Sequence, residues 1–82
     1  MRYADGNEAR LGDVVAIDEK YRGIVVANFD ANEYSDAHPK GQWSYLARGI
    51  LVDTDFGGLV HYEDDEDGQN ENMVLVKRGD DL

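Results

Sequence analysis

The apolar residues of this chain occur in short runs rich in β-branched side chains, and turn signals containing Gly or Asp interrupt them about every ten residues. The clearest run is 23–29, and a second run, 49–54, leads into the turn Asp55-Phe56-Gly57-Gly58. Runs of this length and composition are typical of strands. The pattern therefore predicts a mostly β fold, with strands at 13–17, 21–30, 49–54, 59–63 and 72–77.

Several of these expected strands are apolar on both faces. Within 23–29 both alternating sets of side chains are apolar, and residues 73–76 repeat the pattern. A flat sheet would leave one face in water, whereas closing the sheet or folding it over buries more of both faces and limits open edges. We therefore expect a small antiparallel barrel or a two-layer sandwich of five to six strands, formed by residues 1–82 as a single domain.

Three segments lack strand periodicity. Residues 31–42 have no apolar pattern and are expected to form a long loop. Residues 43–48 favour one short helical turn, because their apolar side chains share a face at helical spacing, and Gly49 would end it. Residues 64–71 are expected to be an acidic hairpin loop that the repulsion between its charges keeps extended.

Two sequence stretches resemble known proteins, and the first of them resembles a family of barrels. Leu11-Gly12-Asp13-Val14-Val15, followed after a turn by Tyr21-Arg22-Gly23-Ile24-Val25-Val26, resembles the opening of SH3-like and KOW-type barrels. That resemblance implies a small SH3-like barrel that binds RNA or protein. The stretch from Gly49 to Tyr62 is similar to small uncharacterised bacterial proteins, and some acidic bacterial proteins of this size are immunity partners of toxins.

The negative charge of the chain is unevenly distributed. The formal net charge is −10, of which residues 1–52 contribute −2 and residues 53–82 contribute −8. A surface of this sign repels phosphate backbones and attracts basic partners. We therefore expect a basic protein partner and no nucleic acid, which goes against the RNA-binding role of KOW-type barrels.

Composition excludes several classes of protein. The absence of cysteine excludes disulfides, thiolate zinc sites and a cysteine nucleophile. No apolar stretch approaches the roughly 20 residues of a membrane-spanning helix, so no membrane is expected. The first residues lack the apolar core of a signal peptide. Together these features lead us to expect a cytoplasmic protein.

Motifs that carry chemistry are missing. Ser35 and Ser44 do not lie in a Gly-x-Ser-x-Gly motif, and His38 and His61 lack the spacing of a zinc site. No glycine-rich phosphate loop precedes a helix. We therefore expect no enzyme, no cofactor and no metal.

The acidic run 63–68 has some likeness to a calcium loop. When Gly68 is placed at the sixth position of an EF-hand, Glu63 occupies the first position and Val74 the twelfth, and neither fits. Weak binding of a divalent cation is therefore kept as an alternative hypothesis and not as the leading one.

The leading hypothesis is a non-enzymatic protein-binding module that blocks a basic partner, as an immunity protein or antitoxin does. A structural subunit of a phage-like or secretion assembly is a further alternative. We expect Trp43 to cover a small core, and we place Tyr34 and Phe56 at a partner interface because one has polar neighbours and the other sits at a hairpin tip. The other partner-binding candidates are the acidic side chains Glu63, Asp64, Asp65, Glu66 and Asp67.

Overall fold

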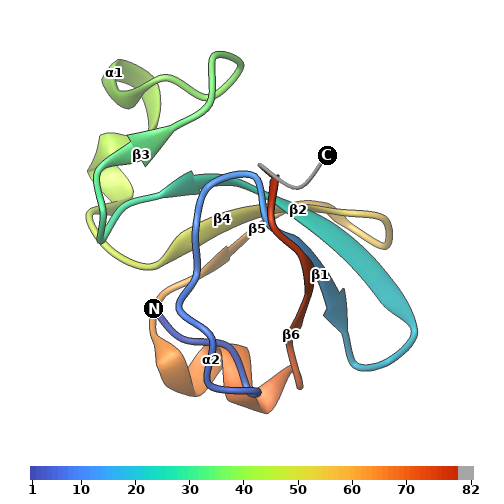
Figure 1. Ribbon diagram of the computed structural model, residues 1–82. Helices are drawn as coiled ribbons and strands as arrows, with labels where there is room; N and C mark the ends of the chain where they lie inside the picture. Colours follow the sequence, from blue (N-terminus) through green and yellow to red (C-terminus); the bar gives the residue numbers. More distant parts are fainter. Residues whose placement is uncertain (80–82) are drawn as a thin grey trace.

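The computed structural model describes residues 1–79, which form one antiparallel sheet with short helices at its margins (Figure 1). The mostly β prediction is confirmed. Six strands pair in the order β5-β4-β2-β1-β6, and β3 pairs with β2 away from this path. The strands are β1 (Val14–Ile17), β2 (Tyr21–Asn28), β3 (Glu33–Tyr34), β4 (Ile50–Thr54), β5 (Gly58–Tyr62) and β6 (Val74–Lys77).

One face of the sheet carries the main core. Val25 of β2 lies opposite Val52 of β4, and both are buried there. Gly23 permits this close packing, because a Cβ at that position would lie 2.5 Å from the Cγ1 atom of Val52. Each fully buried Val or Ile contributes about 1.5–3 kcal/mol to stability. The buried residues of this core are Tyr3, Ala9, Val15, Ile17, Val25, Ile50, Val52, Tyr62 and Met73.

The opposite face of the sheet is partly covered by the segment between β2 and β4. A second cluster is built on Ala27, Phe29 and Leu51, and Trp43 packs against it. This cluster explains why β2 and β4 are apolar on both faces, since each face meets a different layer. Trp43 is half-buried on this cluster, in the covering position that we expected.

The segment from 31 to 48 is more ordered than its sequence suggested. The expected loop contains β3, and the helical turn begins earlier than expected, as α1 (Lys40–Trp43) followed by the 3-10 turn η1 (Ser44–Leu46). Gly49 follows with a φ of +83°, in the left-handed region that glycine adopts without strain. In Figure 1 this green segment projects from the sheet, with α1 at its far end.

The prediction for residues 64–71 is wrong in two respects. Residues Asp65–Asn70 form a helix, α2, rather than an extended loop. The strands on either side of it, β5 and β6, lie at opposite ends of the strand order, so the connection is not a hairpin. Across residues 1–79, no helix has the length and apolar character needed to cross a membrane.

Candidate functional site: an acidic helix beside an open strand edge

Helix α2 forms because its acidic residues stand at its N-terminal end. Asp64 is the N-cap, and its side chain accepts a hydrogen bond from the backbone N–H of Asp67 at 3.1 Å. Asp65, Glu66 and Asp67 occupy the first turn, where the positive end of the helix dipole stabilises negative charge. The run that we expected to repel itself into an extended loop therefore caps a short helix.

Two further hydrogen bonds hold α2 against the rest of the chain. The backbone N–H of Glu63 donates to the carboxylate of Asp67 at 2.8 Å, which closes the turn between β5 and α2. The backbone N–H of Arg2 donates to the carboxylate of Asp65 at 2.6 Å, which ties the N-terminal segment to the helix. The side chains of Asp64, Asp65 and Asp67 therefore hold the helix in place through hydrogen bonds. Glu66 and Glu71 are exposed, and their side chains accept no hydrogen bond within residues 1–79.

The charge of α2 is not neutralised by the chain's own cations. The ion pairs among residues 1–79 join the N-terminal ammonium to Asp30, Arg48 to Glu63, and Arg78 to Asp13. Glu63 is thus the one sequence-predicted acidic residue that has a cationic partner in the described part of the chain, at 2.7 Å from the guanidinium of Arg48. The carboxylates of α2 are therefore available to form ion pairs with a cationic partner.

A shallow cavity of about 260 Å³ lies between α2 and β5. Burial, together with the negative charges of Glu71 and Asp67, raises the pKa of the Tyr62 phenol to about 12. The carboxylates of Asp67 and Glu71 therefore lie close to the Tyr62 phenol, and all three side chains line this cavity. The lining residues are Val60, His61, Tyr62, Asp67, Asn70 and Glu71.

Strand β5 is an open edge. Its backbone pairs with β4 on one side only, and no other backbone hydrogen bond reaches residues 58–62 from the described chain. The alternate N–H and C=O groups on the far side of β5 are therefore free to pair with another strand.

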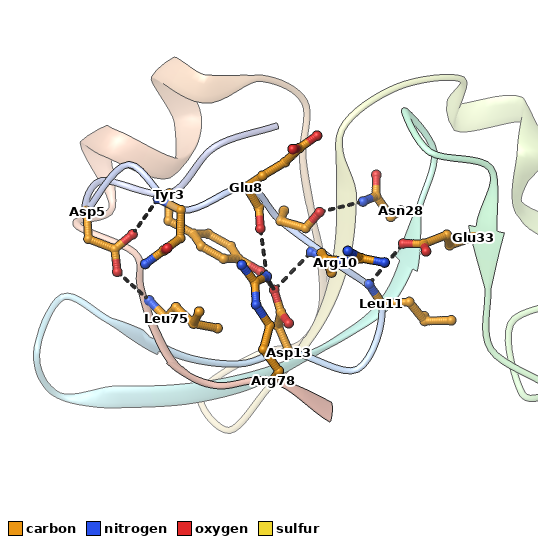
Figure 2. A network of polar contacts seen from close by, with 12 residues as sticks. Tyr3, Asp5, Glu8, Arg10, Leu11, Asp13, Asn28, Glu33, Leu75 and Arg78 are labelled. Atoms are coloured by element: carbon orange, nitrogen blue, oxygen red, sulfur yellow. Dashed lines mark hydrogen bonds and ion pairs between the residues drawn. The ribbon is translucent and has the colours of Figure 1, made fainter. Parts of the chain in front are cut away.

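The opposite edge, β6, is covered. The carboxylate of Asp5 accepts a hydrogen bond from the backbone N–H of Leu75 at 3.0 Å, and Met73 accepts one from the N–H of Ala4 at 2.7 Å. Just beyond β6, the guanidinium of Arg78 donates to the carbonyl of Glu8 at 2.8 Å. Figure 2 shows the Asp5–Leu75 and Glu8–Arg78 contacts in one network along the N-terminal segment. The two edges of the sheet are therefore unequal.

The centre of that network is Asp13, a fully buried carboxylate that the sequence pattern places only at the start of the 13–17 strand and in the barrel-like stretch, without a polar role. Its Oδ2 accepts hydrogen bonds from the Tyr3 hydroxyl at 2.5 Å, the Arg10 backbone N–H at 2.9 Å and Arg78 at 3.0 Å. Burial, and then the hydrogen bond to Asp13, raises the pKa of the Tyr3 phenol far above its usual value. This network joins the N-terminal segment to Asp13, just before β1, and to Arg78, just after β6.

A second cavity, of about 330 Å³, adjoins this network. It is lined by two guanidinium groups and two carboxylates, and the buried Oδ1 of Asp13 receives no donor from residues 1–79. The lining has no net formal charge, and ordered water is the usual partner of such a buried polar atom. The lining residues are Arg10, Leu11, Asp13, Glu33, Arg78 and Gly79.

The two aromatic interface candidates are placed differently from each other. Tyr34 is half-buried and packs on Phe29 with ring centroids 5.8 Å apart, so it belongs to the second cluster rather than to a free surface. Phe56 is 46% exposed at the β4–β5 turn and packs on Tyr21 with ring centroids 4.8 Å apart. Neither ring lines the cavity beside α2.

No group of three or more potential metal ligands gathers among residues 1–79. Comparison of the chain with protein-family models, with curated proteins and with solved structures gave no match.

Proposed function

We propose that this chain is a non-enzymatic binding module that recognises a basic region of another protein in the cytoplasm. The observation that carries the proposal is the uncompensated charge of α2. Within residues 1–79 none of the helix carboxylates is paired with a cation, and of the acidic run only Glu63, just before the helix, has such a partner.

This charge supports fast, selective association. A concentrated negative surface steers a positively charged partner into contact and repels other acidic molecules, and both effects weaken as salt rises. An immunity protein or antitoxin uses such a surface to cover the basic active site of its target. The fixed position of α2 suits this role, because a rigid surface loses little conformational freedom on binding.

Glu66 and Glu71 allow the charge to be tested while the hydrogen bonds that anchor the helix stay in place. The variant E66Q/E71Q removes two exposed charges and leaves the anchoring residues Asp64, Asp65 and Asp67 intact. The matched control D36N/D53N removes two exposed charges that lie outside the cavity beside α2. The wild-type chain and both variants would be immobilised and exposed to lysate of the source cells at low salt, and retained proteins identified by mass spectrometry.

The proposal predicts a retained protein rich in Lys and Arg that binds the wild-type chain and the control but is lost from E66Q/E71Q. Its association rate with the purified wild-type chain should fall several-fold when salt is raised through the physiological range. Equal retention by all three forms, or retention of no basic protein by the wild-type chain, would contradict the proposal.

A further inference from the structure

We propose that the basic partner binds as an added β-strand: an extended segment with Lys or Arg at alternate positions pairs with the open edge of β5 and places its cations along α2. This inference rests on the proposed function and specifies the form of its partner. It combines the unpaired far side of β5 with the acidic cavity that borders the same strand.

The two edges of the sheet are unequally covered. Contacts from Ala4, Asp5 and Glu8 cover β6 and the residues beside it. Beside β5, the corresponding contact within residues 1–79 is the one from the Glu63 N–H, just after the strand, to Asp67, while residues 58–62 receive none on their far side. Soluble proteins commonly cover or charge their edge strands, and an uncovered edge can accept an added strand whose main-chain hydrogen bonds supply much of the affinity.

The carboxylates beside β5 are spaced like the side chains on one face of a strand. Asp67 and Glu71 both line the cavity and are four residues apart, which corresponds to about 6 Å along a helix axis. Alternate side chains on one face of an extended strand are about 6.6–6.8 Å apart. The two spacings match, so an added strand that runs along α2 would place one cation near each carboxylate, while its intervening side chains face the other way.

The same charges disfavour a second copy of this chain as the occupant. Two chains paired through β5 would bring two α2 helices, with the same uncompensated carboxylates, toward one interface. Like charges at an edge are a common protection against self-pairing. Heterologous pairing with a basic strand removes this repulsion and replaces it with attraction.

The test uses a seven-residue peptide of alternating Val and Lys, capped at both ends, and a matched peptide in which Glu replaces Lys. Two further versions of the Lys peptide carry N-methyl groups on alternate backbone amides, in opposite phase, so that only one version blocks the edge that faces β5. Binding is followed through the backbone amide NMR signals of the full chain.

Strand addition predicts that the Lys peptide shifts the signals of residues 58–62 and leaves those of 74–77 in place. One methylated version should bind at least tenfold more weakly than the other, and the Glu peptide should not bind. E71Q should weaken binding several-fold, while D36N should not.

Three results would overturn the inference. The first is no binding of the Lys peptide at millimolar concentration, and the second is shifts confined to residues outside β5 and α2. The third is equal binding of the two methylated versions. If equal binding is accompanied by weakening in E71Q, strand addition fails and charge recognition by α2 stands. If E66Q/E71Q still captures the same proteins as the wild-type chain, the proposed function itself fails.

Discussion

The hydroxyl of Tyr3 provides a single-atom test of how the N-terminal segment is held against β6. In the variant Y3F, the buried carboxylate of Asp13 loses one of its donors and retains the Arg10 N–H and the Arg78 guanidinium. Tyr3 is 1% exposed and Asp13 is fully buried, so bulk water has little access to replace the lost donor.

The expected cost follows from this burial. A hydrogen bond to a charged group contributes about 1.5–3 kcal/mol, and removal of one partner leaves the other incompletely satisfied. We therefore expect Y3F to lower the free energy of unfolding by about 2 kcal/mol. In a domain of this size that loss corresponds to a Tm lower by about 8–16 °C.

Urea unfolding followed by tryptophan fluorescence and by circular dichroism measures this change, and the slope m should stay constant. The control is Y45F, because Tyr45 is 74% exposed and its hydroxyl makes no hydrogen bond within residues 1–79. A loss below about 0.5 kcal/mol in Y3F, or an equal loss in Y45F, would refute the role assigned to the Tyr3–Asp13 contact.

Three further predictions address the turns, the helix and the response to pH. Gly49→Ala should leave little folded protein, because at its φ of +83° the new Cβ would lie 2.0 Å from the Tyr62 carbonyl oxygen. Gly6→Ala is the control: its φ is +88° but the space around it is open, so the free energy of unfolding should fall by only about 1 kcal/mol in thermal melts of both variants. Asp64→Ala should lower the unfolding free energy by about 0.5–2 kcal/mol through loss of the N-cap, and faster amide exchange in 65–70 would locate the effect, whereas unchanged exchange there would argue against the cap. The raised pKa values of Tyr3 and Tyr62 mean that the unfolded chain loses protons more readily than the folded chain above about pH 10. Stability should therefore be complete below that pH and fall as pH rises, and Y3F should remove about 1.4 kcal/mol per pH unit from that slope; identical slopes in the two proteins would contradict the burial of Tyr3.

The strands were predictable because their signals are local. Alternation and β-branched runs marked β1, β2, β4, β5 and β6 to within about two residues, and Gly57-Gly58 marked the turn between β4 and β5. The pairing of β6 with β1, rather than with β5, depends on contacts distant in the sequence, and no local pattern reports it. The openness of the β5 edge could not be foreseen for the same reason.

The acidic composition of residues 64–71 predicted an extended loop, whereas the structure contains helix α2. Its sequence, Asp-Glu-Asp-Gly-Gln-Asn, has no apolar face and contains Gly, so helix propensity argues against it. The helix forms because Asp64 caps it and because Glu63 and Arg2 donate backbone hydrogen bonds to its carboxylates. The signal available in the sequence was an Asp N-cap followed by three acidic residues, which is the charge pattern of a helix start.

The candidate site was predicted in part. The acidic residues from Glu63 to Asp67 lie together at one end of α2, as their adjacency in the sequence required. Glu71 and Tyr62 were missed, although they line the same cavity, because the fold rather than the sequence brings β5 beside the end of α2. The packing of Tyr34 on Phe29 was not foreseen, because its neighbours in the sequence are polar, and its place at a partner interface stays a prediction.

The central claim is that a basic partner pairs with the open edge of β5 beside α2. Amide hydrogen exchange of the full chain, measured alone and with the partner captured at low salt, tests this claim most directly. Strand addition at β5 should protect alternate amides within residues 58–62 while those of 74–77 keep their rates. Protection that appears elsewhere and leaves β5 unchanged would contradict it.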